Sequence, residues 1–256
     1  MSGFLRYRVG PYGAATCPGE FQGCDDSALG AFWAEALGWG VSSEGPGVTN
    51  VEPAVFDWPD AAAVCVDVVT VPDPETVNYR AHLDLATTSA AHQAELVTRL
   101  QELGATRPDI GQGDVPWTVM ADPEGNLFCV REPRPIYRDI GPVAAVVVNC
   151  ADPPAMARFW GEAMDWTLHE VTDDHARLRS AEGVGPHLEF LRTPDPESVC
   201  GRVHLDVKPY PGDDQAAEVA RLRALGATDA DLGQGDVPWV CLADTEGNEF
   251  CVLTPG

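Results

Sequence analysis

Apolar side chains recur at helical spacing in four stretches of the chain. Residues 29–37 and 156–164 place them at i, i+3, i+4, i+7 and i+8, which predicts an apolar stripe on each of two amphipathic helices. Residues 96–103 and 219–225 carry a leucine-rich version of this pattern, and each runs into Gly-Ala-Thr. A glycine at that point is typical of a helix C-terminal cap, so the sequence predicts four helices.

Short runs rich in valine, leucine and aromatic residues lie between and after these helices, which is the pattern of strands. In the first half of the chain the expected strands are 39–42, 51–57, 63–71, 81–86, 115–121 and 126–131. In the second half they are 143–149, 166–171, 175–180, 187–192, 203–207, 237–243 and 248–253. Each half repeats the order strand, helix, three strands, which predicts an α+β fold of four βαβββ modules.

The two halves of the chain are copies of each other. Residues 111–130 (GQGDVPWTVMADPEGNLFCV) and 233–252 (GQGDVPWVCLADTEGNEFCV) are identical at 15 of 20 positions, with a shift of 122 residues. The same shift carries R-A-H-L-D at 80–84 onto R-V-H-L-D at 202–206. A repeat of this length has the size of a domain rather than of a solenoid unit, so we predict a tandem duplication.

The duplication sets the expected domain boundaries. We expect an N-terminal extension at 1–17, a first domain at 18–132, a linker at 133–141 and a second domain at 142–256. The linker is rich in proline and charge, which predicts a short, semi-rigid spacer. The extension has no counterpart in the second copy. Its residues 4–9 could form an early strand, or the whole segment could be a mobile arm.

Composition narrows the classes of partner. The chain has 256 residues and a net charge of −24, so its surface repels nucleic acid and anionic membranes. No apolar run reaches the roughly 18 residues that a membrane span needs. The N-terminal residues also lack the apolar core of a signal peptide. We therefore expect a cytoplasmic protein whose partner is a small molecule.

The chain has eight cysteines, and no two of them form a C-x-x-C pair, which argues against a structural zinc knuckle. Cys65, Cys129, Cys241 and Cys251 lie inside apolar runs. Buried free thiols in a reducing compartment are the favoured interpretation for these four.

Several motifs together resemble a known family. They are the βαβββ order, Phe-Trp in the first helix of each copy, R-x-H-L-D, and D-x-E-G-N-x-F-C-V at the end of each copy. The chain resembles the vicinal oxygen chelate superfamily over residues 18–132 and 142–254, and more narrowly its glyoxalase-like and bleomycin-resistance branch of actinobacterial type. The resemblance implies two tandem glyoxalase-like domains, each a curled mixed sheet around a cavity.

The resemblance also implies where a metal would bind. Metal-dependent relatives hold four ligands on the inner faces of the first and last strands of two modules. The residues that match first strands are His82 and His204, and those that match last strands are Asp67 and Glu189. On the other last strands, where the family has glutamate, the chain has Cys129 and Cys251. The fourth ligand would fall near Pro18 and Ala145. Only Glu189, His204 and Cys251 of the second copy form a candidate metal site. The cofactor stays unknown, and a divalent metal is not favoured because the ligand set is incomplete.

Other residues are candidates to contact a ligand. An arginine two positions before each histidine could bind a carboxylate or phosphate, or form a surface salt bridge. The tryptophan of each G-Q-G-D-V-P-W could stack on a ligand or fill the core. Two histidines of the second copy could extend the Glu189 site or lie on the surface. The residues are Arg80 and Arg202, Trp117 and Trp239, His175 and His187, with Phe56 and Trp58 in a segment that differs between the copies.

An aspartate follows each of the two repeated histidines by two positions. On a strand, Asp84 shares a face with His82, and Asp206 with His204, so each pair could transfer protons. The aspartate could equally cap the following loop. Because both copies must fold, identity between them favours roles in folding.

Three functions follow from the resemblance. The first is a small-molecule enzyme of lyase, isomerase or cyclase type, with His204 and Glu189, or His82 and Asp67, as the acid–base or metal-binding pair. The second is a protein that binds a drug or natural product without turnover, as bleomycin-resistance relatives do. The third is a ring-cleaving dioxygenase. A monomer or a homodimer is expected, and module pairing within each copy or between chains stays open.

Overall fold

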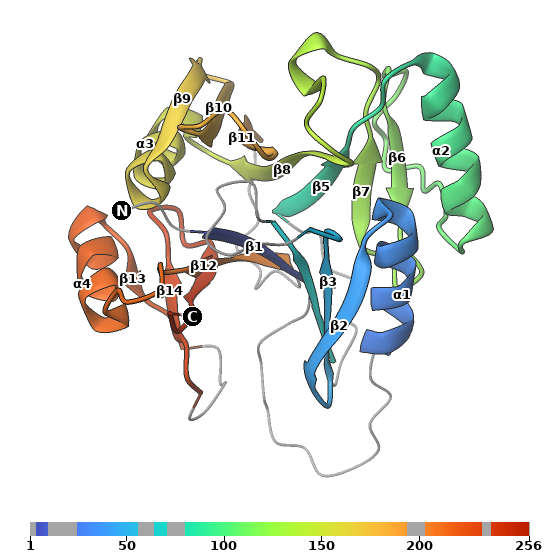
Figure 1. Cartoon of the computed structure of the whole chain (residues 1–256). Helices are drawn as coiled ribbons and strands as arrows, with labels where there is room; N and C mark the ends of the chain where they lie inside the picture. Colours follow the sequence, from blue (N-terminus) through green and yellow to red (C-terminus); the bar gives the residue numbers. More distant parts are fainter. Residues whose placement is uncertain are drawn as a thin grey trace.

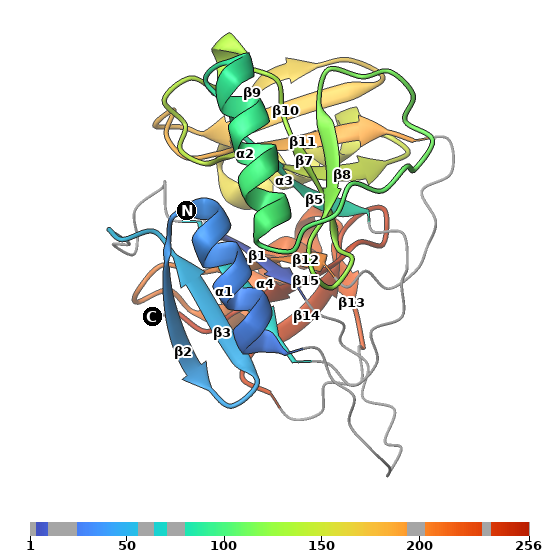
Figure 2. The same ribbon diagram turned by 90° about the vertical axis from the view of Figure 1, so that its right-hand side faces the viewer.

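The computed structural model describes residues 4–9, 25–55, 64–70, 80–193, 203–231 and 237–255. These residues form two mixed β-sheets, with helices packed on their outer faces (Figure 1). The view in Figure 2 shows the two sheets one above the other, with α1 (Asp26–Leu37) and α2 (Ala90–Glu102) along one side. None of the described helices is long and apolar enough to cross a bilayer.

The eight-stranded sheet joins the first module to the fourth. Its strand order is β13-β14-β15-β12-β1-β4-β3-β2. The bounds, in that order, are Thr228–Asp229, Val240–Ala243, Glu249–Val252, Val203–Lys208, Phe4–Val9, Val66–Val69, Val48–Glu52 and Gly40–Gly45.

The seven-stranded sheet joins the second module to the third. Its strand order is β6-β7-β5-β8-β11-β10-β9. The bounds, in that order, are Thr118–Ala121, Leu127–Val130, Ala81–Leu85, Val143–Cys150, His187–Arg192, His175–Ser180 and Trp166–Val171. The prediction of an α+β fold is confirmed, and each sheet takes one module from each repeat.

Residues 4–9 form a strand, as in the first of the two alternatives given for the N-terminal segment. Strand β1 pairs antiparallel with β12 and parallel with β4, so it joins the two modules of its sheet. This strand lies inside the expected N-terminal extension at 1–17 and has the place in its sheet that β8 has in the seven-stranded sheet. It lies farther from α1 along the sequence than β8 does from α3, so the repeat shift gives no counterpart for it.

Each of the four α-helices in the described residues has a side-chain cap at its first turn, and α1, α3 and α4 end at a residue with left-handed backbone. Their first turns are capped by the side chains of Asp25, Ser89, Asp152 and Asp214, each of which accepts a backbone N–H bond. Helix α3 spans Pro153–Met164, and α4 spans Gln215–Leu225. The left-handed backbone at Gly226 ends α4, as the Gly-Ala-Thr motif predicts.

The most strongly repeated motif holds the two modules of each repeat together. The indole Nε1 of Trp33 in α1 donates to Asp122 in the turn between β6 and β7, at 3.2 Å. The same carboxylate accepts bonds from the backbone N–H groups of Glu124 and Asn126 and from the Asn126 side chain. The Trp33 ring also packs edge-on against Phe128 at 5.1 Å. This network explains why Phe-Trp and D-x-E-G-N occur together.

The second repeat builds the same network with Trp160, Asp244, Asn248 and Phe250. Trp160 Nε1 donates to Asp244 at 3.1 Å, and its ring lies 5.1 Å from that of Phe250. The Asp244 carboxylate accepts from the backbone and side chain of Asn248. Identity between the copies thus marks a folding role at these positions.

Replacing Asp122 with alanine should destabilise the fold strongly. The change leaves several buried donors without an acceptor, so we expect a loss of about 3 kcal/mol in the free energy of unfolding. Urea denaturation followed by tryptophan fluorescence measures the loss. Glu182→Ala at an exposed position is the control and should stay within about 0.5 kcal/mol of wild type. Equal unfolding midpoints for the two variants would contradict the folding role.

Candidate functional site

One face of the seven-stranded sheet carries several polar and ionisable side chains, although the strands that form it are largely buried. Along β5, Leu83 and Leu85 belong to the hydrophobic core, so His82 and Asp84 point to the opposite face. The same alternation on β11 sends Leu188 into the core and Glu189 to the polar face. We call this surface the polar face of the seven-stranded sheet.

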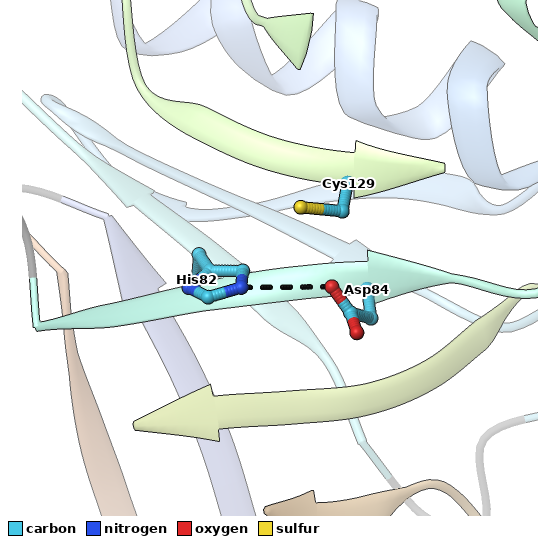
Figure 3. Close-up of side chains that lie close together, drawn as sticks. All are labelled: His82, Asp84 and Cys129. Carbon is cyan, nitrogen blue, oxygen red and sulfur yellow. Dashed lines mark ion pairs between the residues drawn. The ribbon is translucent and has the colours of Figure 1, made fainter. Parts of the chain in front are cut away.

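Three groups meet on the β5 and β7 side of this face. His82 Nε2 lies 3.6 Å from Asp84 Oδ1, and Asp84 pairs in register with Cys129 on β7. One ligand-type atom of each side chain lies within 4.8 Å of the other two. Figure 3 shows the imidazole and the carboxylate on one strand, with the thiol facing them from the next. Asp84 is 2% exposed, whereas the His82 side chain is 20% exposed, so the histidine is the member that a ligand can reach.

Arg131 follows β7 directly and places a positive charge beside this cluster. Its Nε lies 3.4 Å from Asp84 Oδ2. Its guanidinium carbon also lies 4.5 Å from the centre of the Trp117 ring, a distance at which a cation attracts an aromatic face. Trp117 is therefore held by stacking on Arg131, at the edge of the polar face.

The Cys129 thiol is kept protonated. Burial raises its pKa, and the negative charge of Asp84 raises it further, while Arg131 opposes this effect only in part. A protonated thiol is a weak nucleophile. Cys129 is thus a neutral hydrogen-bonding group next to the His82–Asp84 pair.

Glu189 occupies the other half of the polar face and is fully engaged. The Tyr137 hydroxyl donates to its Oε1 at 3.0 Å, and His175 Nε2 lies 3.3 Å from its Oε2. Burial alone would raise the pKa of Glu189, but the bonds from His175 and Tyr137 outweigh burial and lower it. For Tyr137 the effects run the other way, since burial and the nearby negative charge of Glu189 raise its pKa. Glu189 is therefore an ionised carboxylate held by two donors.

Tyr137 comes from the linker between the repeats, in the 3₁₀ turn Pro135–Tyr137. The side chain is 4% exposed, and its ring lies 6.0 Å from that of His187 on the same face. His187 is also buried, which lowers its pKa. The linker predicted as a spacer thus also packs a side chain onto the polar face.

The pairs expected within each copy are wrong. His82 and Glu189 both pair in register with Val147 of β8, so they share the seven-stranded sheet. Asp67 and His204 both pair with Arg8 of β1, in the eight-stranded sheet. The expected pairs His82–Asp67 and His204–Glu189 are split between the sheets, because each sheet combines modules from both repeats.

The family's four metal positions can now be tested in the seven-stranded sheet. They correspond to Glu189, His82, Cys129 and, in place of the expected position near Ala145, Val147, which pairs in register with both Glu189 and His82. Valine offers no ligand atom, and both Glu189 oxygens already accept hydrogen bonds. These residues do not fit the family's ligand set. The candidate set Glu189, His204 and Cys251 is also split, since β11 and β12 belong to different sheets.

The corresponding face of the eight-stranded sheet is described in part. Asp67 is buried, and Asn50 Nδ2 donates to its Oδ1 at 2.6 Å. Asp206 is also buried and pairs in register with Cys251, as Asp84 does with Cys129. The side chain of His204 lies outside the described residues, as do Phe56, Trp58 and Arg202.

The remaining candidates have structural contacts. Arg80 Nη1 donates to the backbone oxygen of Glu246 and to Asn248 Oδ1, which ties β5 to the closing turn of the second repeat. Trp239 packs against the Cys241–Cys251 cluster. His175 lies beside Glu189, with its Nε2 3.3 Å from Glu189 Oε2, which corresponds to the first of the two alternatives given for this residue.

Sequence reasoning missed Tyr137 and Arg131. Tyr137 belongs to the linker, which has no second copy for comparison, and Arg131 corresponds to Leu253 in the second repeat, so identity between the copies does not mark it. The signal that was present is their chemistry: a tyrosine and an arginine follow the last strand of the first repeat in a chain with few positive charges.

Comparisons with known proteins agree with this fold. The sequence profile of a glyoxalase-like domain matches residues 22–131 and 145–253. Glyoxalase I from Zea mays has a similar structure, with a TM-score of 0.59, 18% identity and coverage of 98% of this chain and 90% of that chain. A proposed dioxygenase from Bacillus subtilis gives a TM-score of 0.58 and 13% identity, covering 98% and 83%.

No curated protein sequence matches the chain. The two solved structures share the fold with it and, at these identities, support nothing more specific. The profile matches span most of the chain in two blocks that follow the internal repeat. The protein therefore belongs to the glyoxalase-like family of the vicinal oxygen chelate superfamily and carries two glyoxalase-like domains in tandem.

Proposed function

We propose that the protein is a small-molecule enzyme of lyase, isomerase or cyclase type, acting at the polar face of the seven-stranded sheet. The observation that supports this proposal is the His82–Asp84 pair, 3.6 Å apart, with the carboxylate buried and the imidazole partly exposed. A buried carboxylate beside an imidazole fixes the orientation of the ring. His82 is then the group that accepts a proton from the substrate and returns it.

The other groups of the face have supporting roles in this proposal. Arg131 balances the charge of Asp84, and Trp117 offers a flat surface at the edge of the face. Glu189 supplies a second fixed negative charge, held by Tyr137 and His175. A suitable substrate would carry a positive charge, or an acidic C–H or N–H group, next to an aromatic or planar part.

Replacing His82 with glutamine should lower turnover by about 100-fold or more, because the proton-transfer group is lost while its approximate size is kept. The measurement incubates wild type and variant with a metabolite extract and follows depletion and product formation by mass spectrometry. His92→Gln, on helix α2 of the same repeat, is the matched control and should turn over like wild type. Turnover unchanged in the His82 variant would refute the assignment.

Loading with metal tests the fit of the ligand set. Because Val147 cannot bind an ion and Glu189 is engaged, we expect less than about a tenth of an equivalent of zinc or manganese per chain after loading and desalting. Elemental analysis of protein made without a histidine tag gives the number. A full equivalent that disappears in His82→Gln would show that His82, Asp84 and Cys129 hold an ion, which would contradict a metal-free site.

A second candidate function is non-catalytic binding of a drug or natural product. The feature that favours it is Trp117, which stacks on Arg131 at the edge of the polar face of the seven-stranded sheet. Native mass spectrometry of the protein after exposure to cell extract separates the two functions. A ligand recovered unchanged, and lost in Trp117→Ala, would support binding alone, whereas a chemically altered ligand would support the enzyme.

We do not propose a dioxygenase, because Val147 stands where that iron site needs a histidine.

A further inference from the structure

Two cysteines face each other across the edge of the eight-stranded sheet. Cys241 on β14 and Cys251 on β15 are partners in the antiparallel register, and their sulfur atoms lie 3.4 Å apart. Both are buried, at 3% and 0% exposure. They form a small cluster with Trp239 packed against it. In metal-dependent relatives the position of Cys251 holds a metal ligand. That role does not explain why a second cysteine, Cys241, faces it.

The backbone geometry of this pair suits a disulfide. The carbonyl oxygen of Cys241 accepts a bond from Ala230 N, on the side of β14 that faces away from β15. Cys241 and Cys251 are therefore a non-hydrogen-bonded pair, in which the two Cα atoms lie about 4.5 Å apart. Disulfides span Cα separations of about 4.4 to 6.8 Å, so the bond needs rotation of the side chains and no movement of the strands.

The first repeat lacks this arrangement. The residue at the position of Cys241 is Val119, which pairs in register with Cys129. The two copies thus have the same strands, turn and register, but only the second has a thiol on both sides. This difference provides a control within one chain.

We propose that Cys241 and Cys251 are a redox modification site and form a reversible disulfide when a hydroperoxide is the oxidant. The sulfur of one thiol attacks the terminal peroxide oxygen, the O–O bond breaks, and the thiol proton passes to the leaving oxygen, which gives a sulfenic acid and, with hydrogen peroxide, water. The second sulfur then attacks the sulfenic sulfur and displaces its hydroxyl group, which leaves as a second water with the proton of the attacking thiol. Two thiols are oxidised, and one peroxide is reduced to two waters.

The bond would change the polar face of the eight-stranded sheet. Cys251 pairs in register with Asp206 on β12, so its thiol lies on the face where the family keeps its ligands. Oxidation removes that thiol as a donor or ligand and closes a covalent ring around the turn between β14 and β15. The seven-stranded sheet keeps its Cys129 thiol, so the two faces would respond differently to oxidant.

The test treats the folded full-length protein with hydrogen peroxide, then unfolds it in iodoacetamide and digests it with a protease that cuts after glutamate. Glu246 and Glu249 lie between the two cysteines, so an intact disulfide joins two separate peptides. We expect this joined pair, lighter by two hydrogen atoms, while Cys129 stays alkylated. Dithiothreitol before alkylation should restore both thiols.

The variant Cys241→Val reproduces the first repeat and should leave Cys251 free of any cross-link. Three results would overturn the proposal. They are full alkylation of both cysteines after peroxide treatment, addition of oxygen to Cys251 without a joined peptide, and a cross-link from Cys251 to another cysteine in the wild type.

Discussion

The antiparallel pairing of β5 with β8 is the interaction on which the candidate site depends. It is the only place in the described part of the seven-stranded sheet where a strand of the first repeat pairs with a strand of the second. Its register sets Val147 between His82 and Glu189, and so decides which repeated residues meet. A shift of one residue would turn His82 and Asp84 into the core and Leu83 onto the polar face.

Much of the architecture could be predicted from local patterns. Apolar spacing located α1 and α3, because this signal depends on residues close in sequence. The pairing of modules could not be predicted in this way. It depends on contacts between residues more than 60 positions apart, such as His82 with Val147, and both arrangements of modules bury the same apolar faces.

The sequence predicted individual residues of the candidate site, but it did not predict which of them lie together. His82, Glu189 and Cys129 were named from the sequence, but the partners assigned to the two acid–base residues lie in the other sheet. Tyr137 escaped prediction for a different reason. Its role follows from where the linker crosses the sheet, and nothing local to Pro135–Tyr137 indicates that the tyrosine reaches Glu189.

The exchange of modules has a consequence for the history of the chain. A single repeat on its own would hold half of each sheet, and the inner edges of its first strands would have no partner. Two such polypeptides could cover these edges only by associating with each other. The tandem chain is thus equivalent to a symmetric dimer whose subunits have become covalently joined. Joining frees the two halves to diverge, as Val119 and Cys241 have done.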